Sequence, residues 1–239
     1  MADSIKIMVR VRPFNQREKD LKSKCIVEMA GQQLRLINPA DTNAEPRKFA
    51  FHRCYYSTDD AMGLPPVNNR DVFEDIGREI LDQIYQGYNA TIFAYGQTGS
   101  GKSYSIEGIK DVEKGLLQMC LEAIFQKKEE NSKAGVATSV KVTYLEIYNE
   151  KLRDLLNADS NVEVKAIPIG GNVELRNVKY VTVNSYAEVL KEFEFGKTNR
   201  VVGATQMNKN SSRSHAIFTI YYKDKQYESK FNIVDLAGS

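Results

Sequence analysis

A glycine-rich segment of eight residues, which ends in a lysine and a serine, stands out in the sequence. It is G-Q-T-G-S-G-K-S and fits the pattern G-x-x-x-x-G-K-[ST] at every fixed position. Successive backbone N–H groups of such a loop can point at one phosphate, and glycines let the backbone come close to it. The lysine adds a positive charge, and the final serine offers a hydroxyl to Mg²⁺. The predicted phosphate-binding residues are Gly96, Gln97, Thr98, Gly99, Ser100, Gly101, Lys102 and Ser103.

The residues that flank this loop suit the same interpretation. Residues 90–95, A-T-I-F-A-Y, form an apolar and partly β-branched run that predicts a buried strand. A strand, a glycine loop and a helix in this order are what phosphate binding requires. A helix that begins at Ser103 would add a favourable dipole for the anion. The alternative is a glycine-rich turn that binds nothing, and the strand in front of the loop argues against it.

A second candidate element is a nearly apolar run that ends in an acid. Residues 231–235, F-N-I-V-D, predict a strand, and residues 235–238 have the form D-x-x-G. In nucleotidases an acid at such a strand end holds Mg²⁺ through water. We therefore expect Asp235 to hold Mg²⁺ through water, and the N–H of Gly238 to lie near the terminal phosphate.

The third element is a polar segment at residues 208–215, N-K-N-S-S-R-S-H. Its density of hydroxyls exceeds what a solvated loop needs. It suits a switch that positions a water and touches Mg²⁺ while the loop moves. Asn208 and Lys209 could begin the guanine signature N-K-x-D, but the fourth residue is Ser211, so guanine specificity is rejected.

These three elements must be positioned by strands and helices that alternate along the chain. Strands are expected at residues 5–12, 49–56, 90–95, 139–147, 216–222 and 231–234. Helices are expected at residues 71–86, 116–129 and 186–199, with helical spacing again at 148–156. Short strands and turns are expected at 157–181. The order predicts a single α/β domain over residues 1–239, a P-loop NTPase whose central, mostly parallel twisted sheet carries helices on both faces.

Composition narrows the class of protein further. The chain has 239 residues, 42% of them hydrophobic and 27% charged, with a net charge of +2. This balance does not predict nucleic-acid binding. The three cysteines are an odd number without repeated spacing, which argues against a disulfide framework or a zinc site. Neither a membrane-spanning apolar run nor a signal peptide is seen, so a cytoplasmic protein without membrane insertion is expected.

Five motifs together resemble the kinesin motor domain over the whole length of the chain. They are R-V-R-P at residues 10–13, the extended loop I-F-A-Y-G-Q-T-G-S-G-K-S-Y, L-E-I-Y-N-E-K-L-R-D-L-L, N-K-N-S-S-R-S-H and D-L-A-G-S. The chain is most similar to N-terminal, transport-type kinesins, kinesin-3-like or kinesin-2-like. The resemblance also implies that the motor domain is incomplete at its C-terminal end, truncated after D-L-A-G-S.

The resemblance assigns roles to further residues. Arg10, Arg12 and Pro13 should flank the adenine of ATP or ADP, with Tyr104 as a neighbour of the base. Ser211 and Ser212 should lie near the γ-phosphate and Mg²⁺.

The attacking water and its surroundings are assigned in the same way. The resemblance implies that Asn208 and Ser211 help to place this water. Arg213 should pair with a glutamate immediately after Ser239.

The implied function is a microtubule motor that couples ATP hydrolysis at the loop and the two switch segments to movement. Its ligands would be ATP or ADP with Mg²⁺, and its partner tubulin in microtubules. Cargo or a second copy would bind through regions not in this chain, and the protein would be cytoskeletal. The alternative of another class is a non-motile, nucleotide-regulated microtubule-binding protein of the same fold. An unrelated P-loop NTPase would require both switch motifs to match by accident.

Overall fold

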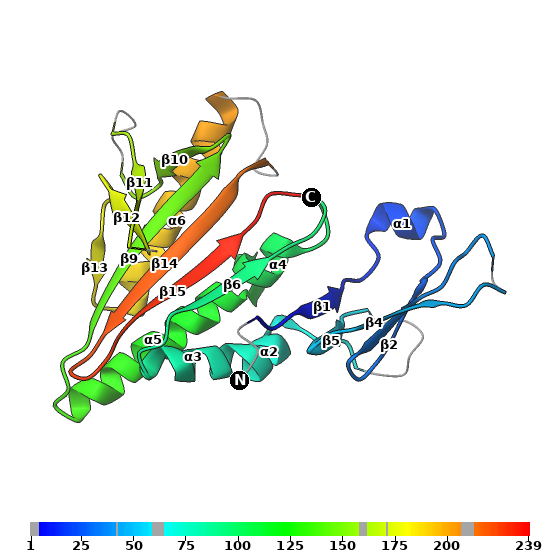
Figure 1. Ribbon diagram of the computed structural model, residues 1–239, viewed down its shortest axis with the longest axis horizontal. Coiled ribbons are helices and arrows are strands. Elements are labelled where there is room, and N and C mark those ends of the chain that lie inside the picture. Colours follow the sequence, from blue (N-terminus) through cyan, green and yellow to red (C-terminus); the bar gives the residue numbers. More distant parts are fainter. Residues whose placement is uncertain (1–4, 42, 59–64, 158–161, 171, 207–212) are drawn as a thin grey trace. The chain divides into compact units, whose positions relative to one another are not determined.

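A computed structural model describes residues 5–41, 43–58, 65–157, 162–170, 172–206 and 213–239 (Figure 1). The chain forms two compact units, Met1–Val72 and Phe73–Ser239, each described here by itself. The single domain predicted for residues 1–239 stays a prediction.

The first unit consists of two small sheets and two short helices. Its elements are β1 (Met8–Val11), α1 (Gln16–Asp20), β2 (Val27–Ala30), β3 (Gln33–Leu36), β4 (Arg47–Ala50), β5 (Arg53–Tyr56) and α2 (Asn69–Val72). β1 pairs in parallel with β5, and β2, β3 and β4 form an antiparallel sheet. Met29, Leu34 and Tyr56 are its buried core. The strand predicted at 49–56 is therefore wrong as one element, because β4 and β5 belong to different sheets.

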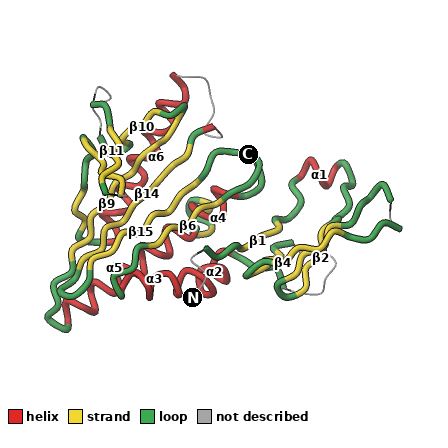
Figure 2. The backbone as a smooth tube through the Cα atoms, viewed as in Figure 1, coloured by secondary structure: helices red, strands yellow, loops and turns green. Residues whose placement is uncertain are grey.

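The second unit holds the glycine loop and a six-stranded sheet in the order β10-β9-β14-β15-β6, with β13 paired to β9 (Figure 2). Its elements are η1 (a π-helix, Phe73–Gly77), α3 (Arg78–Tyr85), β6 (Ala90–Ala94), α4 (Lys102–Glu107), β7 (Gly108–Ile109), β8 (Glu113–Lys114), α5 (Leu116–Lys133), β9 (Ser139–Tyr148), β10 (Lys151–Asp154), β11 (Lys165–Ile169), β12 (Asn172–Arg176), β13 (Val181–Val183), α6 (Tyr186–Gln206), β14 (His215–Lys223) and β15 (Glu228–Asp235).

The α/β class is confirmed, but the prediction of a mostly parallel sheet is wrong. In this sheet β15 and β6 run parallel, and the other described pairs are antiparallel. The cause lies in the connections. β14 and β15 are joined by a tight turn in which Asp224 and Tyr227 are hydrogen-bonded, and so short a connection permits only antiparallel pairing.

The described helices of this unit pack on one face of the sheet, and helices on its other face stay a prediction. Side chains of α4, α5 and α6 meet the same inward-pointing residues, among them Tyr144 and Phe218. Tyr85 of α3 contacts Tyr222, which shares that face with Phe218 because side chains alternate along a strand. On the opposite face Phe93 is 58% exposed.

The stretch 148–156 is a β-hairpin and not the helical continuation that its spacing predicted. β10 pairs with β9 in an antiparallel register in which Tyr148 faces Lys151. The two turn residues, Asn149 and Glu150, have φ angles of 47° and 62°. A two-residue turn with positive φ at both positions matches the twist of the flanking strands, and asparagine tolerates that conformation.

The other helix predictions are confirmed with shifted ends. The helix predicted at 71–86 falls within α2, η1 and α3 except for its last residue, because α3 ends at Tyr85, and 116–129 lies within α5. α6 continues seven residues beyond the predicted end, from position 199 to Gln206. The short strands expected at 157–181 are confirmed by β11 and β12, which form a separate two-stranded sheet.

Three aromatic rings form the centre of the core between α6 and the sheet. Phe193 of α6 lies 5.6 Å from Tyr144 and 5.6 Å from Phe218, measured between ring centroids. Tyr144 and Phe218 are 5.3 Å apart in an edge-to-face arrangement. Such pairs add specific geometry to the burial of large apolar surfaces. Gly196 lies about one helical turn after Phe193 in α6. Because it has no side chain, it leaves room for the Tyr144 ring.

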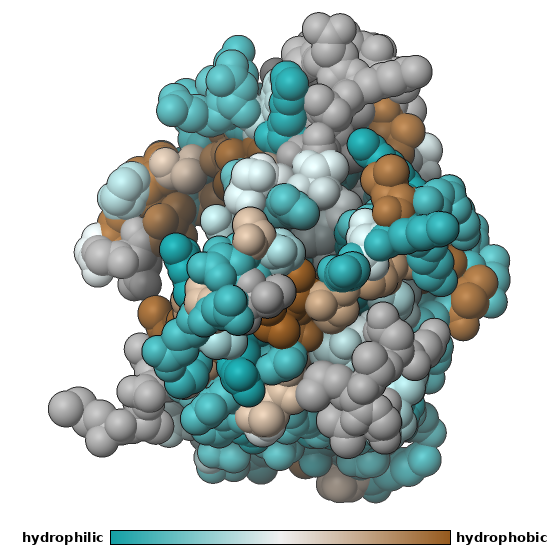
Figure 3. Space-filling view, turned by 90° about the vertical axis from the view of Figure 1, so that its right-hand side faces the viewer, coloured by the Kyte–Doolittle hydropathy of each residue, from teal (hydrophilic) through white to brown (hydrophobic). Residues whose placement is uncertain are grey.

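The face of the molecule in Figure 3 is mostly hydrophilic, with hydrophobic residues in small separate patches. Over the described residues, no helix is both long and apolar enough to cross a membrane.

The three cysteines, Cys25, Cys54 and Cys120, are free thiols. Complete burial raises the pKa of Cys120 to about 12.

Gly196→Ala should destabilise the protein although alanine is the better helix former. A Cβ at this position would lie 2.9 Å from Cε1 of Tyr144 and closer still to Cδ1. The clash should outweigh a helix-propensity gain of about 1 kcal/mol and leave a net loss of about 1–3 kcal/mol. Urea unfolding measures this difference. Lys191→Ala, at an exposed position of the same helix, is the control, and equal stability of both variants would contradict the prediction.

Candidate nucleotide site

The glycine loop joins β6 to α4, as the sequence predicted. Gly96 and Gly101 have φ angles of 148° and 98°, which L-residues with a side chain rarely adopt. At Gly96 an added Cβ would also lie 2.6 Å from the Ser100 hydroxyl oxygen. α4 begins at Lys102, one residue before the predicted Ser103, and has six residues. Because the helix is so short, loop N–H groups and Lys102 are better phosphate donors than its dipole.

The ammonium group of Lys102 is held inside the loop. Nζ donates to the carbonyl oxygens of Gly96 and Gln97 at 2.8 and 3.1 Å. These are neutral acceptors, whereas phosphate oxygens are charged and form stronger hydrogen bonds with a cation. The lysine is thus already placed at the loop, and a phosphate can take over its hydrogen bonds.

Ser103 and Asp235 are in direct contact although 132 residues separate them. The Ser103 hydroxyl donates to Oδ2 of Asp235 at 2.7 Å. The contact follows from the parallel pairing of β15 with β6, in which Asp235 is opposite Ala94. The carboxyl ends of both strands therefore meet at one edge of the sheet, and the loop and the acid emerge side by side.

The surroundings of Asp235 fit a magnesium site. The residue is 5% exposed, and its second oxygen, Oδ1, is buried and has no hydrogen-bond partner among the described residues. A buried oxygen without a partner is costly, so it suits a site that a ligand completes. Mg²⁺ prefers oxygen ligands and usually keeps several waters. Ser103 and Asp235 can supply such oxygens, whereas Ser212 lies outside the described residues.

Two backbone N–H groups fix the segment after Asp235, one by donating to a side chain and one by donating to a carbonyl. The N–H of Ala237 donates to Nδ1 of His215 at 3.0 Å. The N–H of Ser239 donates to the carbonyl of Gly96 at 3.2 Å. The D-L-A-G-S segment, with Gly238 between these two residues, thus contacts both the glycine loop and the start of β14. An acceptor at Nδ1 means that a neutral His215 carries its proton on Nε2.

The polar switch segment is described only at its end. Arg213 is exposed and precedes the buried Ser214. Asn208, Ser211 and Ser212 lie outside the described residues, so their roles stay predictions.

Arg10, predicted to flank the adenine, is held within the first unit. Its Nε donates to Ser57 Oγ at 2.8 Å and its Nη1 to Asn69 Oδ1 at 2.6 Å. Nη2 donates to the carbonyl of Val67 at 3.2 Å. The guanidinium thereby connects β1 to the chain around α2. Its role toward a base stays a prediction.

Arg12 forms a two-pronged ion pair with Glu18 at 2.7 and 2.8 Å and also donates to the carbonyl of Pro13. Arg12 and, second, the Asn15 N–H lower the pKa of Glu18 to about 2. Glu18 also belongs to a capping box with Asn15 that starts α1. Arg12 and Pro13 are thus positioned by local structure, and their contact with a base stays a prediction.

Tyr104, the predicted neighbour of the base, donates its hydroxyl to Glu113 of β8. This bond joins α4 to the small β7–β8 hairpin. The ring is partly exposed. Its stacking on a base stays a prediction.

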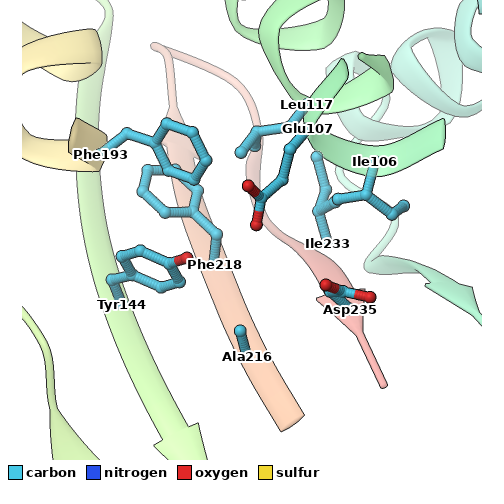
Figure 4. Close-up of a pocket in the computed structure, with 9 residues that line it drawn as sticks. All are labelled: Ile106, Glu107, Leu117, Tyr144, Phe193, Ala216, Phe218, Ile233 and Asp235. Atoms are coloured by element: carbon cyan, nitrogen blue, oxygen red, sulfur yellow. The ribbon is translucent and has the colours of Figure 1, made fainter. Parts of the chain in front are cut away.

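Sequence reasoning missed a buried charge cluster beside the site. Arg200 of α6 lies within 4.0 Å of Glu107, Glu146 and Asp235. Glu107 and Asp235 line a small cavity with the aromatic core, and in Figure 4 the Glu107 carboxylate and the Tyr144 hydroxyl point into it. Burial, aided by Glu107, raises the pKa of Tyr144. Arg200 stands just past the predicted helix end, so no local pattern marked it.

A strand, a glycine loop with lysine and serine, and an acid-ended neighbouring strand define a P-loop NTPase. The family model of the kinesin motor domain matches residues 10–239 and crosses the boundary between the two units. The chain belongs to the kinesin motor-domain family.

Curated relatives agree with the kinesin-3-like resemblance. Human kinesin-like protein KIF1C is 40% identical over 249 residues, which cover 99% of this chain and 22% of that protein. Human kinesin-like protein KIF1B is 39% identical over 249 residues, 99% of this chain and 14% of that protein. Human kinesin-like protein KIF13B is 36% identical over 261 residues, which cover 100% of this chain and 14% of that protein. This chain thus spans between 14% and 22% of the length of these relatives.

His215→Phe should loosen the segment after Asp235, because it removes the acceptor of the Ala237 N–H. Loss of a hydrogen bond worth about 0.5–1.5 kcal/mol corresponds to amide exchange of Ala237 that is about 2- to 12-fold faster. Hydrogen–deuterium exchange of residues 235–239 measures it. His215→Asn, whose side-chain oxygen can replace Nδ1, should restore protection. Unchanged exchange in the phenylalanine variant would refute the role.

Proposed function

We propose that this chain is the ATP-hydrolysing motor part of a protein that moves along microtubules, with Mg²⁺ at the site of Ser103 and Asp235. The observation that carries the proposal is the Ser103–Asp235 contact of 2.7 Å beside a complete P-loop in a kinesin-family chain. The reaction is attack of water on the γ-phosphate of ATP.

The protein would catalyse this reaction by positioning and charge stabilisation. Loop N–H groups between Gly96 and Ser103 hold the phosphates, and Lys102 exchanges its carbonyl acceptors for phosphate oxygens. Mg²⁺, when bound, neutralises charge that develops on the phosphate oxygens. Asp235 would hold the ion through its carboxylate oxygens.

The switch segments would position the attacking water and respond to the loss of the γ-phosphate. Asn208 and Ser211 hold the attacking water, Ser212 adds a hydroxyl on the metal side, and Gly238 contacts the γ-phosphate through its N–H. Loss of that phosphate would release these contacts and change the interaction with the microtubule.

The adenine would pack against the rings of Pro13 and Tyr104 and the aliphatic stems of Arg10 and Arg12, as the resemblance implies. Such packing does not read the edge of the base. In the cell the protein would be cytoplasmic and microtubule-associated.

Two measurements separate this proposal from a non-motile microtubule-binding protein of the same fold. The first is ATP turnover of the intact protein with and without microtubules, and the second is gliding of microtubules over a surface coated with it. A motor shows turnover that microtubules stimulate, together with gliding. Nucleotide-dependent binding to microtubules without either result would support the alternative.

Lys102→Ala should abolish tight ATP binding, because it removes the flexible cation of the loop. Calorimetric titration with Mg·ATP measures the affinity. Lys110→Ala, which removes an exposed lysine nearby, is the matched control and should bind like the wild type. Circular dichroism checks that both variants fold. Wild-type affinity in folded Lys102→Ala would remove Lys102 from the site.

Arg213→Ala should slow hydrolysis while leaving ATP binding nearly intact. Arg213 belongs to the polar switch segment and not to the glycine loop, and a bidentate pair with a carboxylate would close the switches around the water. Its loss should therefore lower the turnover rate and leave the nucleotide Kd almost unchanged. Single-turnover hydrolysis and fluorescent-nucleotide binding on the intact protein measure the two effects. Normal hydrolysis, or equal losses of rate and affinity, would contradict this role.

A further inference from the structure

The side chain of Asn232, in the middle of β15, is hydrogen-bonded to both neighbouring strands. Its Oδ1 accepts from the Thr219 hydroxyl of β14 at 3.0 Å, and its Nδ2 donates to the Thr91 hydroxyl oxygen of β6 at 3.0 Å. β15 lies between these two strands in the sheet (Figure 1). The three residues are directly opposite one another in the strand registers. One amide therefore joins three strands in a single row.

A second asparagine acts at the start of the same strand pair. Oδ1 of Asn89, the residue before β6, accepts from the backbone N–H of Lys230 in β15 at 2.7 Å. This bond and the bond between Asn232 and Thr91 each join residues that are 141 positions apart in the sequence. Asparagine side chains thus hold β15 against β6 at two levels, in addition to the hydrogen bonds of the backbone.

The register of β15 against β6 is not fixed by a turn. The tight turn at residues 224–227 fixes β14 against β15, whereas β6 and β15 are distant in sequence. Phe231 and Ile233 are both buried on one face of β15, so a slip by two residues would leave the apolar pattern intact. A slip of this size toward the glycine loop would place Asn232 opposite Phe93. Both asparagine bonds to β6 would then be lost, so the two amides select the native register.

We propose that Asn232 is a positioning residue that sets the register of β15 on β6 and thereby places Asp235 beside Ser103. Asp235 is the last residue of β15, where the pairing with β6 ends opposite Ala94. Without the amide, this end of the strand can separate or slip, and fewer molecules keep the contact of 2.7 Å between Ser103 and Asp235. A ligand binds only the competent fraction, so the apparent affinity for Mg²⁺ falls with that fraction.

This inference rests on the proposed function, and it concerns the metal side of the site. The glycine loop continues from β6 into α4 and does not include β15. Loss of the amide should therefore weaken Mg²⁺ binding and leave nucleotide binding in EDTA unchanged.

The first experiment measures dissociation of fluorescent ADP from the intact protein against Mg²⁺ concentration. Asn232→Val removes both side-chain bonds, although valine suits a strand better than asparagine does. It should raise the half-saturating Mg²⁺ concentration about 2- to 12-fold, the range that one hydrogen bond supplies. ADP affinity in excess EDTA should match the wild type. Asn232→Thr has nearly the shape of valine and one hydroxyl that can bond across strands, so it should recover part of the loss.

Lys141→Val is the matched control, because it places the same residue at an exposed position on the same face of the sheet. Its Mg²⁺ midpoint should equal that of the wild type. A wild-type midpoint in folded Asn232→Val would overturn the proposal. If this variant does not fold, Thr91→Val replaces it, since it removes the acceptor of the amide at an exposed position. A wild-type midpoint in Thr91→Val, or the same midpoint in Thr91→Val and Thr91→Ser, then overturns the proposal.

A second experiment needs no nucleotide and separates failure of this inference from failure of the proposed function. Hydrogen–deuterium exchange in the ligand-free protein should become faster at residues 94–96 and 235–239 in Asn232→Val, with α5 unchanged. Equal exchange in Asn232→Val and Lys141→Val overturns the positioning role even if the protein binds Mg·ADP. Faster exchange throughout α5 as well would show a general loss of stability and would also overturn it. Selective exchange in a protein that fails to bind nucleotide would uphold the register role and refute the proposed function alone.

Discussion

The candidate site depends on the parallel pairing of β15 with β6. Because the two strands run in the same direction, they end at the same edge of the sheet, with Asp235 opposite Ala94. The glycine loop and the D-L-A-G-S segment therefore leave the sheet side by side, and Ser103 reaches Asp235. A shift of one residue in this register would turn Asp235 to the other face of the sheet. The other described strand pairs of the sheet are antiparallel, so this single pair decides where the chemistry lies.

The helix-covered face of the sheet changes in character along its length. Away from the site it is an aromatic core around Phe193, and toward the carboxyl edge it becomes a cluster of buried charges around Arg200. Buried ion pairs contribute little net stability, since desolvation offsets their attraction. Their value here is geometric, because each carboxylate belongs to a different element. The apolar core supplies the stability that permits this arrangement beside the site.

The side chains of Lys102 and Ser103 already have hydrogen-bond partners within the protein. Lys102 is bonded to two carbonyl groups of its own loop, and Ser103 is bonded to Asp235. A nucleotide would therefore replace existing hydrogen bonds, and its affinity would reflect the difference between the two sets. Oδ1 of Asp235 differs from these two side chains, because it is buried and has no hydrogen-bond partner among the described residues. The lysine and serine of the loop are thus held by protein contacts, whereas the metal side has an oxygen that a ligand could complete.

The sequence by itself determined the features that depend on neighbours in the chain. The glycine loop between a strand and a helix, the acid at the end of residues 231–235 and the α/β class all follow from local spacing. The prediction from the sequence was wrong at residues 148–156, because leucines there recur at helical spacing. These residues instead form a hairpin with a tight turn at Asn149 and Glu150, and the turn depends on the pairing of β10 with β9. The mixed sheet, the helices on one face and the Arg200 cluster also came from the tertiary structure alone. Strand direction and burial arise from contacts between distant segments, and no local pattern records which segments those are.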